Sequence, residues 1–151
     1  NAGTVLKIIG PVQPDFAGRI SDWNLRDDVI FTGSLSHDET LAEIAVSKCL
    51  VLPSYTEGFP NVVLEAFATK TPVVASDVGA LPEMLSGGAG LMVSPGDVDG
   101  IKDAIDKILS EECFAMRIGA CGRAKALKEY SDTEVEKALY DCWTEVLRTY
   151  Q

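Results

Sequence analysis

The feature that most constrains the fold of this chain is an alternation of short apolar runs with segments long enough to form helices. Five runs rich in Val, Ile and Leu end in Gly, Pro, Ser or Asp, and they cover residues 4–10, 28–33, 49–54, 71–77 and 90–96. Their continuous rather than alternating hydrophobicity is typical of parallel strands that are covered on both faces. We therefore predict an α/β fold with an open parallel sheet of about five strands, helices on both faces and right-handed crossovers.

Capping signals indicate where the intervening helices begin. Ser36 and Glu39 match a capping box, in which each side chain bonds the backbone amide of the other residue across the first turn. Asp97 is placed to cap the helix that follows the last strand. A second box at Ser131 and Glu134 predicts the start of the final helix.

Beyond the last strand the alternation stops, and residues 111–128 and 131–150 predict two or three successive helices. The final helix carries an apolar stripe, which is more often typical of core packing than of a partner surface. The stripe consists of Val135, Leu139, Cys142, Trp143, Val146 and Tyr150. Trp23 is likewise interpreted as a packing residue. Because 46% of the 151 residues are apolar, one sizeable core is possible, and we predict a single domain over residues 1–151.

The charge of the chain narrows the classes of partner. Its 13 Lys and Arg against 23 Asp and Glu give a formal net charge of −10. Such a chain repels nucleic acids and anionic lipid surfaces, so we predict no nucleic acid and no direct membrane contact. Apolar runs fall short of the roughly 20 residues that cross a bilayer, and no basic-then-apolar leader opens the chain. We therefore predict a cytoplasmic protein, and a membrane-peripheral location of the full-length protein stays open.

The residues that often ligate metals are scattered along the chain. Four cysteines at wide spacings, without a C-x-x-C pair, are expected to be reduced and mostly packed. His37, the single histidine, follows the predicted N-cap Ser36 and is interpreted as a solvated first-turn residue. Neither a metal site nor a disulfide framework is predicted.

The predicted architecture places a ligand beyond the carboxyl ends of the strands, where the loops into the following helices gather. The segment 53–60 is such a loop, in which Gly58 lets the backbone approach a ligand and Pro60 suits the first helical position. Unpaired amides at the positive end of a helix dipole suit a phosphate. Here they belong to Phe59, Asn61 and Val62.

Two carboxylates flank this helix start. Glu57 lies in the loop and Glu65 follows after seven intervening residues, about 200° around the helix from Val63. Carboxylates accept hydrogen bonds from paired sugar hydroxyls, so the pattern predicts a diphosphate between two bound sugars. The residues alone leave an alternative open, in which the helix dipole favours Glu65 and Glu57 is only solvated.

Part of the chain resembles the donor-binding lobe of retaining glycosyltransferases with two Rossmann-like lobes (GT-B), in particular glycosyltransferase family 4. The resemblance is carried by residues 53–85, PSYTEGFPNVVLEAFATKTPVVASDVGALPEML, and by the following GLMVSPGD. The E-x7-E motif of that family is matched by Glu57 and Glu65. The resemblance is good over residues 29–104 and loose in the terminal helices.

The resemblance implies a role for each site residue. Glu57 would contact the transferred sugar and stabilise charge near the reacting carbon, as the catalytic candidate, and Glu65 would bind the ribose hydroxyls. The donor would be a nucleotide-diphosphate sugar, with no metal and no cofactor. The remaining predicted binding residues are Gly58, Phe59, Pro60, Asn61 and Val62 at the diphosphate, and Gly33, Ser34 and Leu35 at the base.

The chain also departs from the family pattern, in which the lobe usually begins with another strand and a loop whose Arg and Lys clamp the diphosphate. Lys7 lies inside a predicted strand. Arg19 and Arg26 follow the strand at residues 4–10 and not the additional strand of the family pattern, so none of the three replaces the Arg and Lys pair. Without the missing strand, either the first and third runs pair directly or a partner chain fills the gap. We expect the fragment alone to be inactive, with a saccharide or lipid-linked acceptor bound by an N-terminal lobe that this sequence lacks.

Two other functions stay open at this point. A nucleotide-sugar epimerase would use the same two-lobe fold but needs further acid and base residues between the lobes. A non-catalytic module would keep nucleotide-sugar binding or subunit contact without chemistry.

Overall fold

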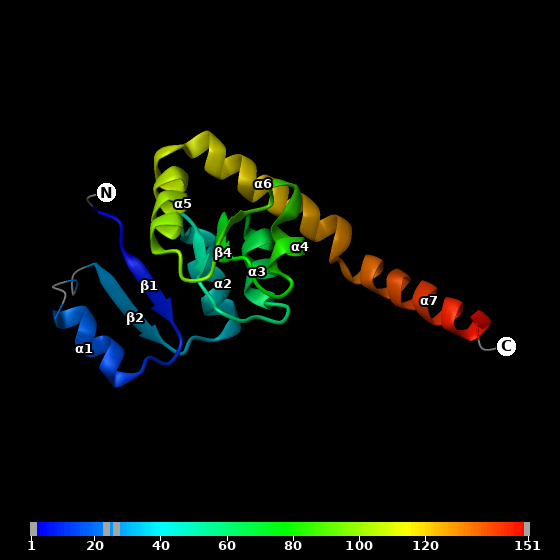
Figure 1. Cartoon of the computed structure of the whole chain (residues 1–151), viewed down its shortest axis with the longest axis horizontal. Helices are drawn as coiled ribbons and strands as arrows, with labels where there is room; N and C mark the ends of the chain where they lie inside the picture. The colour runs from blue at the N-terminus through cyan, green and yellow to red at the C-terminus, as the bar shows by residue number, and fades with distance from the viewer. Residues whose placement is uncertain (1–2, 23–24, 26–27, 150–151) are drawn as a thin grey trace. The chain divides into compact units, whose positions relative to one another are not determined.

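The computed structural model describes residues 3–22, 25 and 28–149, and the chain divides into two compact units, residues 1–43 and 44–151. Trp23 and Arg26 lie outside the described residues. Figure 1 shows the α/β composition and the helical C-terminus that the sequence predicts. The prediction of a single domain over residues 1–151 stays a prediction.

The first unit contains a two-stranded parallel sheet. Strands β1 (Leu6–Ile9) and β2 (Val29–Gly33) pair in parallel, and helix α1 (Pro14–Asp22) connects them. Phe16 of α1 meets Phe31 of β2 edge to face, with ring centroids 6.2 Å apart.

Helix α2 (His37–Val46) begins at the predicted capping box. The Glu39 carboxylate accepts from the Ser36 amide at 2.8 Å and from the Ser36 hydroxyl at 2.7 Å, while Ser36 Oγ accepts from the Glu39 amide at 3.3 Å. This confirms the box. His37 is the first residue of α2 and is exposed, as predicted.

The second unit contains a three-stranded parallel sheet in the order β3-β4-β5. Its strands are β3 (Leu50–Leu52), β4 (Val73–Ser76) and β5 (Leu91–Val93). β4 is central and buried along its whole length. All five predicted strands therefore exist and are parallel, which confirms the fold class. β1 and β2 form the sheet of the first unit, and β3, β4 and β5 form that of the second. A direct pairing of the first and third runs stays a prediction.

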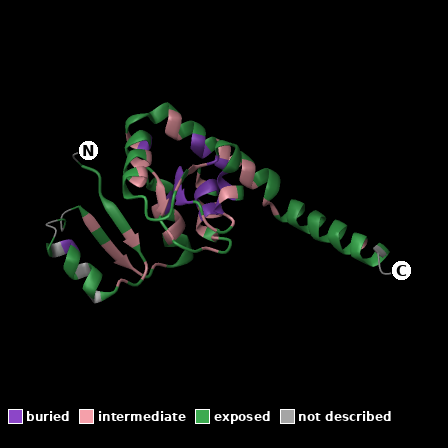
Figure 2. Ribbon diagram, in the orientation of Figure 1, coloured by how far each residue is buried: buried purple, intermediate pink, exposed green. Residues whose placement is uncertain are grey.

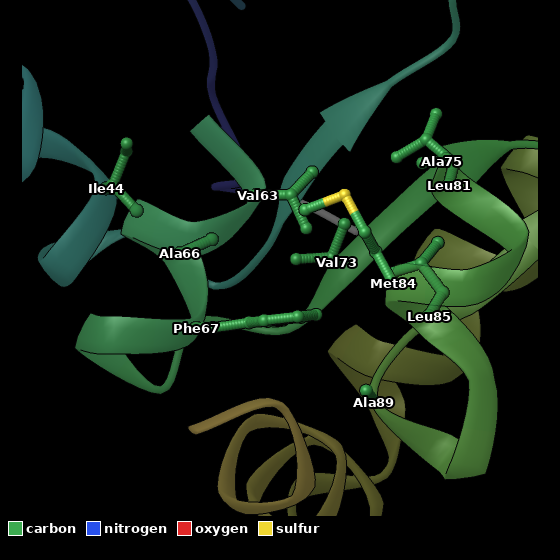
Figure 3. Packing of buried hydrophobic residues seen from close by; sticks show 10 residues of the cluster. All are labelled: Ile44, Val63, Ala66, Phe67, Val73, Ala75, Leu81, Met84, Leu85 and Ala89. Carbon is green, nitrogen blue, oxygen red and sulfur yellow. The ribbon is translucent and has the colours of Figure 1, made fainter. Parts of the chain in front are cut away.

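The core of the second unit lies between this sheet and the two helices that follow β3 and β4. These are α3 (Asn61–Thr69) and α4 (Leu81–Leu85), the latter extended by the 3-10 turn η1 (Ser86–Gly88). Figure 3 shows side chains from α3, β4 and α4 converging, and Figure 2 shows burial concentrated there. The largest fully buried ones are Phe67, Leu81, Met84, Leu85, Val63, Val73 and Val74.

Two long helices complete this core. α5 (Val98–Ser110) is capped as predicted, because Asp97 Oδ1 accepts from the Gly100 amide at 2.9 Å. α6 (Glu112–Glu129) packs closely on α3 through two buried glycines, Gly119 and Gly122.

The final helix, α7 (Asp132–Thr149), starts directly after Ser131, as predicted, but the described residues show no side-chain bond between Ser131 and Glu134. Tyr150 lies outside the described residues, and the other five residues of the apolar stripe are exposed, with 64% of Trp143 accessible. Figure 2 shows the described part of the helix almost wholly exposed. The interpretation of this stripe as core packing is therefore wrong for the described chain. Within the described residues no helix has both the length and the apolar character to cross a membrane.

The four cysteines are free thiols. Cys49 and Cys121 are partly buried, and burial raises the pKa of the Cys49 thiol. Cys113 and Cys142 are exposed, so the prediction that the thiols are mostly packed holds for only half of them.

Candidate functional site

The segment between β3 and α3 carries the first predicted carboxylate. β3 ends at Leu52 and α3 begins at Asn61, so residues 53–60 form a loop at the carboxyl end of the strand. Within it the Ser54 hydroxyl donates to Glu57 Oε1 at 2.6 Å, and both residues are partly buried. Ser54 therefore fixes one oxygen of the Glu57 carboxylate, while the second oxygen keeps its acceptor capacity.

Ser54 was missed as a site residue from the sequence. The signal was present, because Ser54 and Glu57 have the same S-x-x-E spacing that marks the helix start at Ser36.

The backbone after Glu57 lies against the turn that follows β4. The carbonyl oxygen of Gly58 accepts a hydrogen bond from the Ala80 amide at 3.1 Å. The loop is thus connected both to its own strand and to the neighbouring central strand.

The helix start agrees with the prediction except in its first residue. Pro60 is the N-cap of α3, with φ −75° and ψ 108°, and the first helical residue is Asn61. Pro60 therefore precedes the position that we predicted, because its extended ψ excludes it from the helix. Its carbonyl accepts from the Val63 amide at 3.1 Å.

The backbone amides that precede Val63 at the start of α3 are available to a ligand. Among the described residues, no hydrogen bond is found from the amides of Phe59, Asn61 or Val62 to a protein acceptor, and Pro60 supplies no side-chain cap. Unsatisfied amides at the positive end of a nine-residue helix are favourable partners for an anion.

Phe59 is half exposed and rests on Tyr130 at the end of α6. The two rings meet edge to face, with centroids 5.6 Å apart. Burial, and then the charges of Glu83 and Glu129, raise the pKa of the Tyr130 hydroxyl. Sequence reasoning missed this contact, because Tyr130 lies 71 residues (130 − 59) beyond Phe59 in the chain.

Glu65 lies one turn into α3. The predicted core face of this helix is confirmed, because Val63, Ala66 and Phe67 are buried. Glu65 lies off that face and is partly exposed. Its carboxylate and that of Glu57 are therefore both carried by a short stretch of loop and helix whose inner face is fixed in the core.

The predicted site residues fall into two groups. Glu57, Gly58, Phe59, Pro60, Asn61, Val62 and Glu65 lie together on the loop and on the start of α3. Gly33 ends β2 with φ +70°, and Ser34 and Leu35 follow it in the first unit, so their contact with a base stays a prediction.

The second unit also contains a cavity that does not belong to this loop. A cavity of about 250 Å³ lies between η1 and α6, where Lys125 already bonds the Glu83 carbonyl, and its ammonium donates to the Ser86 hydroxyl at 2.6 Å. The part of the chain that the structure describes holds no group of three or more His, Cys, Asp or Glu placed to bind a metal ion.

Comparison with known proteins identifies relatives of this arrangement. A family model described as glycosyl transferases group 1 matches residues 1–111. The MMP α-(1→4)-mannosyltransferase of Mycolicibacterium hassiacum is 34% identical over 114 residues, which are 74% of this chain and 28% of that protein. The chain spans about a quarter of the length of the curated relatives that it matches first.

Solved structures show the same fold. The C-terminal domain of a glycosyl transferase group 1 family protein (LpcC) from Francisella tularensis has a TM-score of 0.76 and 26% identity, covering 85% of this chain and 70% of that one. A mutant of TarM from S. aureus, in complex with fondaparinux, α-GlcNAc-glycerol and UDP, has a TM-score of 0.78 and 25% identity, covering 90% of this chain and 28% of TarM.

Proposed function

Because the chain belongs to the glycosyl transferases group 1 family, we propose that it is the donor-binding lobe of a retaining glycosyltransferase. One observation carries this proposal: Glu57, held by Ser54, lies in the loop that leads into a helix start whose amides have no protein acceptor among the described residues. A carboxylate, a row of amide donors and a second carboxylate, Glu65, match in order the three parts of a nucleotide-diphosphate sugar.

Each part of the donor then has a partner. The diphosphate lies on the amides of Phe59, Asn61 and Val62, where the helix dipole stabilises its charge in both the substrate and the leaving group. Glu57 binds hydroxyls of the transferred sugar and stabilises positive charge near its reacting carbon. Glu65 accepts from the ribose hydroxyls.

Gly58 and Pro60 shape the turn over which the diphosphate passes. Contact of the base with Gly33, Ser34 and Leu35, which belong to the first unit, is a separate proposal. The donor is the only small molecule in this scheme, and we propose that neither a metal nor a further cofactor takes part, because the helix start receives the leaving charge.

The acceptor is bound elsewhere in the full-length enzyme. The share of the curated relatives that this chain covers leaves room for another lobe, and the name of the mycobacterial relative, a mannosyltransferase, supports transfer of a sugar. We propose a saccharide or a lipid-linked acceptor. The isolated chain binds donor but does not transfer it, because transfer needs donor and acceptor held together.

Calorimetric titration of the chain tests this function. UDP, GDP, UDP-glucose and GDP-mannose are titrated in buffer with EDTA, and we expect one base to be preferred, with micromolar to millimolar affinity. Glu65→Ala is expected to weaken nucleoside diphosphate binding at least tenfold. Glu57→Gln is expected to retain the nucleoside diphosphate but to lose the additional affinity for the sugar conjugate.

The matched control is Glu136→Ala, which removes an exposed carboxylate on α7. It should leave every affinity unchanged. Absence of binding to all four ligands would reject the donor-lobe function, and binding that survives both site substitutions would reject the site.

A further inference from the structure

The turn between β4 and α4 approaches the Glu57 loop more closely than any side chain would permit. A Cβ atom built on Gly79 would lie 2.1 Å from the Glu57 carbonyl oxygen, 2.8 Å from its carbonyl carbon and 3.1 Å from the Gly58 carbonyl oxygen. All three atoms belong to backbone, so no side chain can rotate aside to relieve the contact. Gly79 also has φ +57°, which L side chains rarely adopt.

A hydrogen bond fixes the same contact from the next residue. The Ala80 amide donates to the Gly58 carbonyl at 3.1 Å. Gly79 therefore leaves space for the Glu57–Gly58 peptide, and Ala80 holds that peptide in place by its hydrogen bond.

The turn itself is anchored in the core. Leu81 and Met84 of α4 are fully buried (Figure 3), and the Met84 amide donates to the Ala80 carbonyl at 3.0 Å. A rigid support of this kind limits where the carboxylate above it can lie.

We propose that Gly79 is a positioning residue that sets the place of Glu57 in the donor site. This inference rests on the proposed function. A methyl group at residue 79 requires the Glu57 peptide to move by about 1 Å before the contact exceeds 3.0 Å. Misplacement of a catalytic group by about 1 Å weakens the contacts that the group makes with its substrate. The sugar part of the donor should therefore be bound less well, while binding of the nucleotide part is retained.

The test compares two glycines with similar φ angles. Gly79→Ala adds a methyl group against the Glu57 loop, whereas Gly87→Ala adds one at φ +70° with no atom within 4 Å. We expect Gly79→Ala to reduce the affinity ratio of nucleotide sugar to nucleoside diphosphate at least tenfold, and Gly87→Ala to leave that ratio unchanged. Adding Gly79→Ala to Glu57→Gln should reduce it no further, because both changes remove the same contact.

A readout without ligand separates this inference from the proposed function. Backbone amide NMR shifts should change in Gly79→Ala at residues 54–60, and in Gly87→Ala only near residue 87. If the wild-type chain bound no nucleotide sugar, the proposed function would fail, and these shifts would still decide whether Gly79 positions the loop.

Two results would overturn the proposal. One is a folded Gly79→Ala whose loop shifts and sugar-dependent affinity equal those of Gly87→Ala. The other is loss of folding in both Gly79→Ala and Gly79→Asn while the same two changes at Gly87 leave the chain folded, because Gly79 would then serve stability alone. Asn is included because it tolerates left-handed φ better than Ala while adding the same Cβ atom.

Discussion

Glu57 and Glu39 are both carboxylates bound by a serine three residues earlier, but only Glu39 lies in the first turn of a helix. The Glu39 oxygen accepts from the amide of Ser36 as well as from its hydroxyl, so the box is closed around the backbone. Glu57 accepts from a hydroxyl alone and stays in a loop. The same local pattern therefore produces a cap in one place and a positioned site carboxylate in the other.

The Ser36 box has a measurable effect on titration. The side-chain bond and then the backbone bond from Ser36 lower the pKa of Glu39 below its ordinary value of 4.5. Because the folded pKa is depressed, the associated stability is present above pH 4.5 and is lost as pH falls through the folded pKa. Ser36→Ala should raise the Glu39 pKa part of the way back, since the amide bond remains.

NMR titration of the Glu39 side chain checks this expectation. Ser110→Ala, which removes an exposed hydroxyl on α5, is the control and should leave the Glu39 pKa unchanged. A Glu39 pKa that is equal in wild type and Ser36→Ala would show that the hydroxyl does not contribute.

At the scale of elements, the position of α3 depends on close packing of α6. A Cβ atom built on Gly119 would lie 2.0 Å from the carbonyl oxygen of Lys70, the left-handed C-cap of α3. The Lys70 amide donates back to the carbonyls of Ala66 and Phe67, so the cap cannot shift without loosening the helix end.

Gly119→Ala should therefore destabilise the chain despite the better helix propensity of Ala. Overpacking of this kind costs about 1–3 kcal/mol, against about 1 kcal/mol gained from propensity. Chemical denaturation measures the difference. Gly18→Ala in α1 meets no atom within 4 Å and is the control, expected to be neutral or stabilising. Equal stability of the Gly119 variant and wild type would contradict the close approach.

At the scale of the whole molecule, local sequence patterns correctly predicted the features that local interactions determine, namely strands and helix caps. Each of the five apolar runs became a strand, and Asp97 and Ser36 cap the helices that they were expected to cap. Strand order could not be predicted in the same way, because runs of similar hydrophobicity carry no information about which neighbour they pair with. The final helix shows the same limit: its stripe has the spacing of a core helix, yet Trp143 is exposed.

The site residues also divide into those that a local sequence pattern predicts and those that it does not. Glu57, Glu65 and the helix start could be predicted because they lie within nine residues of each other. Gly79 and Tyr130 could not, because each reaches the loop only through tertiary packing. Ser54 lay within reach of the pattern and was missed.

The most direct test of the central claim is an NMR titration of the chain that locates the bound donor residue by residue. On addition of the preferred nucleotide sugar, we expect the amide shifts of residues 57–65 to change most, and those of Phe59, Asn61 and Val62 to move downfield as they bind the diphosphate. Largest changes at the cavity beside Lys125, with the loop and the start of α3 unaffected, would contradict the account.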